Sequence, residues 1–144
     1  MARPRMALTG PLRVEDPAYL DVPDSIAERS RPAITPETAA FWRGLTEEKV
    51  VLDRCTVCSR WTHTPVGSCA WCGGPVEPAE IDGRARVNTF TVCYLEFGPG
   101  LVAPYVAALV NPLVEPSLQI TTNIVGCRID EIRCDLEVVP VFVH

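Results

Sequence analysis

The segment Cys55-Thr56-Val57-Cys58 is followed, after ten residues, by Cys69-Ala70-Trp71-Cys72, so that two Cys-x-x-Cys pairs stand close together. Each pair forms a tight turn whose two sulfur atoms can reach one ion, and four thiolates make a closed tetrahedral Zn²⁺ site without an open position for water. Such a site performs no reaction; in small peptides, binding of a structural zinc contributes about 10–16 kcal/mol to folding. We therefore predict a structural zinc ion held by Cys55, Cys58, Cys69 and Cys72. Two disulfides or a redox-active dithiol are the alternative interpretations.

The length and composition of the chain restrict the classes of protein to which it can belong. Its 144 residues suit one ordinary domain or two small modules that share a core. The net charge of −5 argues against an electrostatic interaction with nucleic acid. No apolar run approaches the length of a membrane span, and no apolar segment of a secretory signal follows the basic start. Seven cysteines, an odd number, then indicate reduced thiols and bound metal in the cytoplasm.

Residues 1–34 form a proline-rich arm without a lasting helical or alternating pattern. A disordered leader is one interpretation. Apolar residues are nevertheless scattered through the arm, and a fully solvated tail usually carries fewer of them. The other interpretation is therefore an extended arm that lies on a partner or on the chain's own domain.

A helix is predicted over residues 35–48. Its Thr-Pro-Glu start provides Thr35 as a cap, a proline at the first helical position and an acidic residue at the positive end of the helix dipole. Phe41 and Leu45 lie four residues apart on one face, with Trp42 beside them. We expect this apolar group to contact a neighbouring surface, either in the same chain or in a partner.

Residues 49–80 are predicted to be the zinc ribbon, and a strand over residues 49–54 leads into Cys55. Trp61 and Trp71 lie in or next to the cysteine turns, where we expect them to shield the metal from water. Stacking on a nucleic-acid base is the competing role. His63 is interpreted as an ordinary surface histidine, since four thiols already complete the metal site.

Residues 81–144 contain short apolar strands separated by turn residues, which predicts a small closed barrel of OB type. Strands are expected over residues 84–97, 105–110, 118–124 and 136–143, with Pro140 marking an edge or a bulge in the last of them. Several strands are apolar on both faces, which indicates that part of the outer wall is covered by an obligate partner. The segment has four basic and seven acidic residues, the wrong balance for a barrel that binds single-stranded nucleic acid.

No catalytic constellation is evident. The two histidines, His63 and His144, are far apart in the sequence, and no phosphate-binding glycine-rich loop is present. Three cysteines remain once the metal is bound. Cys93 is expected in the core, and Cys127 and Cys134 flank a turn without a visible activating base. The residues alone therefore predict a zinc-stabilised barrel without an active site.

The order of several motifs resembles a known family. The motifs are Phe41-Trp42-x-Gly44-Leu45, the four cysteines, Gly83 before a long strand, Pro104-Tyr105-Val106-Ala107, and Thr121-Thr122-Asn123-Ile124-Val125-Gly126-Cys127. Over residues 36–143 the chain resembles the OB-fold acyl-CoA-associated family with a rubredoxin-like zinc ribbon. The resemblance implies a mainly β fold made of an N-terminal helix, a zinc ribbon and a small OB-type barrel, with the four cysteines as zinc ligands. The long proline-rich arm departs from the family pattern.

The resemblance also implies a function. Members act as small subunits or fused domains beside thiolase-superfamily enzymes, among them acyl-CoA acetyltransferases and lipid-transfer-protein-like retro-aldolases of steroid side-chain degradation, and some are joined to MaoC-like hydratases. We therefore expect a non-catalytic subunit that completes such an enzyme, with acyl-CoA near the interface. The residues expected to contact the partner are Phe41, Trp42, Leu45 and Tyr105. A nucleic-acid-binding ribbon and OB module is the alternative, and a thiol enzyme using Cys127 and Cys134 is a third reading.

Overall fold

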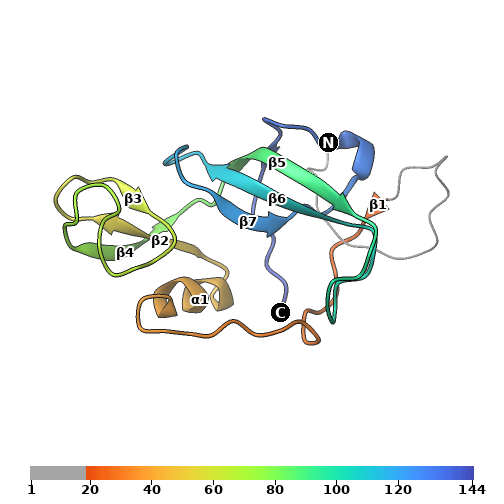
Figure 1. Ribbon diagram of the computed structural model, residues 1–144, viewed down its shortest axis with the longest axis horizontal. Helices are drawn as coiled ribbons and strands as arrows, with labels where there is room; N and C mark the ends of the chain where they lie inside the picture. The colour runs from red at the N-terminus through yellow and green to blue at the C-terminus, as the bar shows by residue number, and fades with distance from the viewer. Residues whose placement is uncertain (1–18) are drawn as a thin grey trace.

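Two antiparallel β-sheets follow one another along the chain in the computed structural model, which describes residues 19–144 (Figure 1). The first sheet contains β2 (Val50–Cys55), β3 (Trp61–Thr62) and β4 (Val76–Ile81). The second, in the order β7-β6-β5-β9, contains β5 (Ala85–Cys93), β6 (Tyr105–Pro112), β7 (Ile120–Asn123) and β9 (Glu137–Val138). A helix, α1 (Ala39–Thr46), precedes the first sheet. The predicted fold class, mainly β with a helix, a cysteine-rich ribbon and an OB-type curled sheet, is confirmed.

In the first sheet, called the ribbon below (residues 50–81), β2 lies between β3 and β4. The strand predicted over residues 49–54 is present as β2. No strand was predicted at β4, because Pro78 and two glutamates leave this segment without an apolar run. Pro78 is accommodated because β4 is an edge strand, where one missing backbone N–H leaves no partner unsatisfied.

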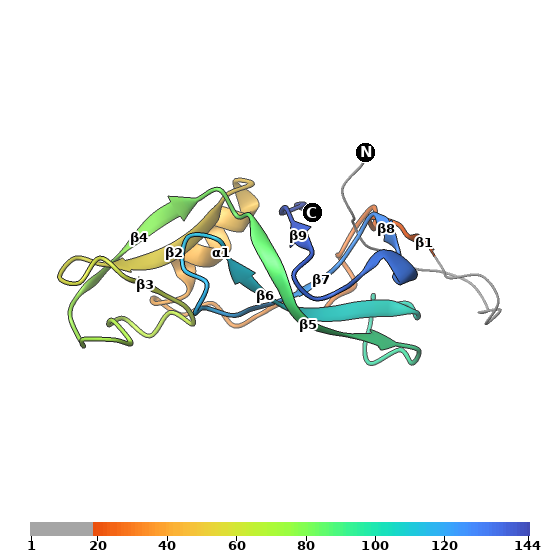
Figure 2. The ribbon, with the colours of Figure 1, turned by 90° about the horizontal axis from the view of Figure 1, so that it is seen from above.

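The second sheet, called the OB sheet below, encloses the main core. A register shift between Val87 and Thr89 bends β5 where it pairs with β6. Val87 and Val106 are fully buried inside the curl, and Leu20 joins them from β1 (Tyr19–Leu20). β1 pairs with β8 (Cys127–Arg128) at the end of the molecule that lies opposite the ribbon (Figure 2).

Several predicted strands have different bounds in the structure. β5 ends at Cys93, and the following loop leaves Tyr94, Leu95 and Phe97 exposed. The predicted strand over residues 136–143 is wrong beyond β9 (Glu137–Val138), because Pro140 has no N–H to continue the ladder. β7 is likewise shorter than the predicted strand over residues 118–124.

Helix α1 is shorter than predicted. Residues 36–38 form a turn rather than the first helical residues, and Thr35 closes this turn, its N–H donating to Oγ1 of Thr38 at 2.9 Å. Within the helix Gly44 is buried, and a Cβ added there would lie 2.6 Å from Cγ2 of Val51. The small residue therefore allows α1 to lie directly on β2.

The part of the predicted arm that the structure describes lies on the chain's own domain. Leu20 is fully buried, and the N–H of Ile26 donates to the carbonyl of His144 at 3.4 Å. Residues 21–38, called the strap below, run from β1 along one side of the molecule to α1 (Figure 1). The part of the predicted arm before residue 19 lies outside the described residues. Among residues 19–144, no helix combines the length and the apolar character needed to cross a membrane.

Candidate metal centre and adjoining groove

Four cysteine side chains converge at one end of the ribbon. Their Sγ atoms all lie within 4.8 Å of one another, with 3.5 Å between Cys55 and Cys72 and 3.6 Å between Cys58 and Cys69. These separations are too long for disulfides, whose sulfur atoms are about 2.05 Å apart. They are near the roughly 3.8 Å edge of a tetrahedron with metal–sulfur distances of about 2.3 Å. The structure thus brings together the four cysteines predicted to be ligands.

The two cysteine turns have the same backbone geometry. In the first, the N–H of Ser59 donates to the carbonyl of Cys55 at 3.1 Å; in the second, the N–H of Gly73 donates to the carbonyl of Cys69 at 3.0 Å. Ser59 and Gly73 have φ values of 61° and 72°, so each turn ends in the left-handed region. This repetition directs both pairs of sulfur atoms to one point.

Backbone N–H groups point at the sulfur atoms. Val57 and Cys58 each donate to Sγ of Cys55 at 3.4 Å, and Trp71 donates to Sγ of Cys69 at 3.4 Å. Such donors favour the thiolate form and fix the orientation of the ligand. The backbone therefore supplies an outer shell for a metal–thiolate centre.

The electrostatics of the four-cysteine cluster favour the binding of a cation. Burial raises the pKa of the Cys69 thiol, but the backbone N–H groups of Cys72 and Trp71 and the neighbouring thiols outweigh it and lower that pKa to about 6. The backbone N–H of Gly74 favours the Cys72 thiolate, yet the other thiols raise the pKa of Cys72 to about 12. Several thiolates therefore accumulate here only when a metal ion neutralises them, and a soft, four-sulfur donor set fits the group that the sequence predicted.

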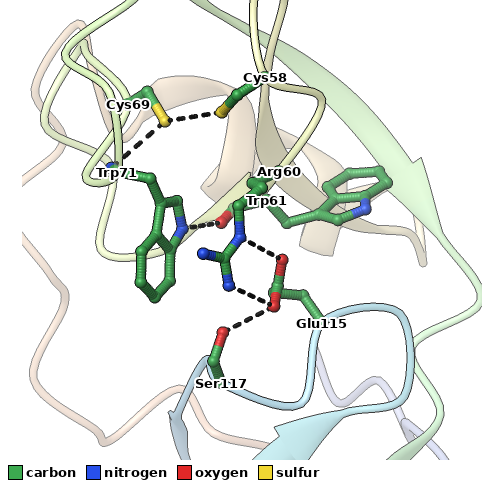
Figure 3. Close-up of polar contacts among 7 residues, drawn as sticks. All are labelled: Cys58, Arg60, Trp61, Cys69, Trp71, Glu115 and Ser117. Atoms are coloured by element: carbon green, nitrogen blue, oxygen red, sulfur yellow. Dashed lines mark hydrogen bonds and ion pairs between the residues drawn. The ribbon is translucent and has the colours of Figure 1, made fainter.

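The two tryptophans of the ribbon take part in a contact that the sequence did not reveal. The guanidinium carbon of Arg60 lies 3.5 Å from the centroid of the Trp71 ring, and Nε1 of Trp71 donates to the carbonyl of Trp61 at 3.3 Å (Figure 3). The Trp71 side chain is 47% exposed. Shielding of the metal from water by either ring stays a prediction.

Two residues lie in surroundings that differ from the predicted ones. His63 is half-buried rather than a surface residue, because its ring packs 5.1 Å from that of Phe41, and burial lowers its pKa. Tyr105 is only 5% exposed, because it points from β6 into the core, and burial raises its pKa. Tyr105 also lines the groove described below, and its role as a partner contact stays a prediction.

A groove of about 1190 Å³ lies beside the ribbon and is lined by the strap, α1, β7 and residues 138–144. Phe41, Trp42 and Leu45, which the sequence singled out as an apolar group, are half-buried in its wall. All the residues that line it belong to the described part of the chain, and none of them is acidic, although the chain has 18 acidic residues. The basic residues and histidines that line it are Arg29, Arg31, Arg43, His63 and His144, and Tyr105 lines it as well. No sequence motif predicts the groove, because its walls come from segments far apart in the chain.

Comparison with known proteins identifies the family. Residues 78–143 match the family model described as the ChsH2 C-terminal OB-fold domain. A solved structure described as the Ltp2–ChsH2(DUF35) aldolase is 30% identical, with a TM-score of 0.68 over 76% of this chain and 85% of that one. The chain belongs to the ChsH2-like DUF35 family. The predicted resemblance is therefore confirmed.

Two further proteins are similar to this chain. A DUF35 protein of unknown function from Sulfolobus solfataricus is 24% identical, with a TM-score of 0.50 over 61% of this chain and 67% of that one, and it shares the fold. A probable enoyl-CoA hydratase alpha subunit from Thermomonospora curvata is 31% identical over 114 residues, which is 78% of this chain. The chain spans only 35% of the length of that curated relative.

Proposed function

We propose that this chain is a non-catalytic, zinc-binding subunit that completes a thiolase-superfamily acyl-CoA enzyme in the cytoplasm. The main support is its likeness to the Ltp2–ChsH2(DUF35) aldolase, which extends over 76% of the chain and so includes more than the OB sheet. A lipid-transfer-protein-like retro-aldolase of steroid side-chain degradation is the first candidate partner, and an acyl-CoA acetyltransferase is the second. The name of the Thermomonospora curvata relative supports an enoyl-CoA hydratase as a further member of the complex, and we propose one of MaoC type.

Zinc, in this proposal, is held by Cys55, Cys58, Cys69 and Cys72 and serves the fold. With four protein ligands a bound zinc ion has no open position for substrate or water. Its contribution is folding free energy for residues 49–80, a segment with few buried apolar side chains of its own. The segment at residues 35–48, which contains α1, and the barrel at 81–144 complete the proposed division of the chain.

The remaining cysteines support the view that the partner performs the chemistry. Cys127 is buried, and burial raises the pKa of its thiol to about 12, which opposes formation of a thiolate nucleophile. Cys134 is exposed and is separated from it by the 3₁₀ turn η1 (Ile129–Glu131). In this proposal the partner supplies the nucleophile or base and the oxyanion hole, while this chain orders the partner's active-site loops.

The groove supports acyl-CoA as the ligand near the interface. Its wall is mainly apolar, with Phe41, Trp42 and Leu45 of α1 on one side. Its charged lining residues are arginines in a protein whose net charge is negative. An apolar channel with cationic groups and no carboxylate suits a ligand with an acyl chain and anionic phosphates. We propose that the partner closes the open side of this groove.

Co-expression with a lipid-transfer-protein-like thiolase-fold protein from the same genome tests the proposal. We expect the two chains to co-purify and the partner to be active only in the complex. Phe41→Ala or Trp42→Ala is expected to weaken co-purification without releasing zinc. Val66→Ala is the matched control, because Val66 is 64% exposed and is not among the groove residues. Turnover of a thioester by the isolated monomeric chain would overturn the proposed role.

A further inference from the structure

The side chain of Arg60 is held between the ribbon and the OB sheet. One face of its guanidinium lies on Trp71, and its Nη2 and Nε atoms reach the carboxylate of Glu115 at 3.2 and 3.4 Å (Figure 3). Glu115 belongs to the loop at residues 113–119 that joins β6 to β7, 55 positions further along the chain. The arginine is therefore a direct link between two separate units of the fold.

Both residues on the ribbon side of this link are tied to the cysteine cluster. The N–H of Cys55 donates to the carbonyl of Arg60 at 2.9 Å, which joins Arg60 to the first cysteine turn. The N–H of Trp71 donates to Sγ of Cys69 at 3.4 Å, which joins Trp71 to the second. The stack of Arg60 on Trp71 consequently keeps its geometry only while both turns hold theirs.

On the side of the OB sheet, Glu115 makes hydrogen bonds that hold the loop at residues 113–119 together. Its side chain is only 15% exposed and also accepts a hydrogen bond from Oγ of Ser117 at 2.7 Å. The carbonyl of Glu115 accepts from the N–H of Leu118 at 3.0 Å, and Nδ2 of Asn111 donates to the carbonyl of Leu118 at 2.7 Å. The loop ends at Gln119, which lines the groove together with the following strand. The loop that Glu115 holds together thus adjoins one wall of the groove.

We propose that occupancy of the four-cysteine site is coupled, through the stack of Arg60 on Trp71 and the ion pair of Arg60 with Glu115, to the order of the loop at residues 113–119. When metal holds the two cysteine turns together, the stack aligns the guanidinium with Glu115 and the loop is fixed against the ribbon. When the turns separate, the ion pair loses its geometry and the loop is released. This inference rests on the proposed zinc ligands but not on the identity of the partner or of the acyl ligand.

Thermodynamic linkage makes the coupling reciprocal: a change that releases the loop must weaken metal binding by the same factor. We therefore expect Glu115→Gln, which keeps the shape of the side chain and removes its charge, to lower zinc affinity about 5- to 10-fold, within the range of couplings between sites. Trp71→Leu should have an effect of similar size. The double variant should lose little more than either single variant, because both break the same link.

The experiment measures zinc affinity of the full chain by competition with a chromophoric chelator, for the wild type, Glu115→Gln, Trp71→Leu and the double variant. Asp130→Asn is the matched control, since Asp130 pairs with Arg128 at 3.1 Å on the OB side without touching the ribbon. Hydrogen exchange of the zinc-loaded proteins follows residues 113–119, with β5 as the internal reference. We expect faster exchange of the loop in Glu115→Gln and Trp71→Leu, and wild-type exchange in Asp130→Asn.

The outcomes separate the two proposals. A wild-type chain that binds no zinc would overturn the proposed metal centre and the coupling with it. If the wild type binds zinc and the zinc affinity of Glu115→Gln lies within twofold of the wild-type value, the coupling alone would be overturned. The coupling would also be overturned if the fold-losses of zinc affinity in the two single variants multiplied in the double variant.

Discussion

Gly83 lies against Pro140 at the joint between the ribbon and the OB sheet. A Cβ added to Gly83 would be 2.7 Å from Cγ of Pro140 and 2.9 Å from Cγ2 of Val50, and the φ of Gly83 is +70°. The chain therefore passes from β4 to β5 at a point where both the backbone conformation and the available space require glycine.

Gly83→Ala is expected to destabilise the protein by about 2–4 kcal/mol. Alanine is disfavoured in the left-handed backbone conformation of this residue, and its Cβ would overpack the site. The closest atoms belong to a proline ring and a β-branched side chain, neither of which can rotate away. Urea unfolding of the zinc-loaded protein measures the difference. Gly67→Ala is the control, because Gly67 has a φ of +76° but its added Cβ would meet only Cγ of Glu37 at 3.7 Å. Equal losses of stability in the two variants would contradict the role of the contact with Pro140.

Leu20→Ala is expected to cost about 2–5 kcal/mol of stability, the usual range for a leucine removed from a packed core. Leu20 is fully buried although its strand β1 has only two residues. Ile34→Ala, in the same strap but 66% exposed, should change stability by less than about 0.5 kcal/mol. Thermal unfolding of both variants checks the prediction. A Leu20→Ala protein as stable as Ile34→Ala would mean that β1 is not part of the folded unit.

The sequence predicted best those features that depend on residues close together in the chain. The two cysteine pairs specify the four-thiol cluster by themselves, because each turn needs only a few neighbouring residues. The strand before Cys55 was predicted because three apolar residues, Val50, Val51 and Leu52, follow one another there. β4 was missed because its pairing with β2, rather than its own composition, makes it a strand.

Features that depend on distant residues were not predictable. Tyr105 was expected at a partner surface from the family resemblance, and only the curl of the sheet shows that its side chain joins the core beside the groove. The groove, and the link from Arg60 to Glu115, join segments whose proximity no local pattern reveals.

Removal of the metal is expected to unfold the ribbon. The wild type should contain one zinc per chain by elemental analysis, and Cys69→Ser should lose it, because three thiolates bind the ion less tightly than four. Cys134→Ser is the control, since Cys134 is exposed and lies outside the four-thiol cluster.

After chelation and denaturation, a thiol assay should find all seven cysteines reduced. Only three free thiols would support two disulfides instead of a metal site.

A carboxylate placed in the groove is expected to weaken binding of a long-chain acyl-CoA. Val141 is 38% exposed and lines the groove, so Val141→Glu adds a negative charge to an apolar wall that has none. We expect affinity to fall about tenfold, or by about 1.4 kcal/mol, measured by fluorescence titration of the complex. Val66→Glu is the control, since Val66 is 64% exposed and is not among the groove residues. Equal affinities in the two variants would remove the groove as the acyl-CoA site.

The ion pair between Arg60 and Glu115 is expected to weaken in acid. The hydrogen bonds from Arg60 and then from Ser117 hold the pKa of Glu115 below its ordinary value. Because the folded-state pKa is the lower one, the stabilisation is fully present above the ordinary glutamate pKa of about 4.3 and is lost as pH falls through the folded pKa.

Acid also protonates the cysteine thiols and releases metal, so the titration is best followed at Glu115 itself, through the carbon-13 shift of its carboxyl group. Arg60→Gln should raise the pKa of Glu115 toward its ordinary value, because the largest favourable contact of the carboxylate is removed. Arg84→Gln is the control, since Arg84 pairs with Asp82 at 2.7 Å. A Glu115 pKa at or above the ordinary value in the wild type would mean that Arg60 does not hold the loop.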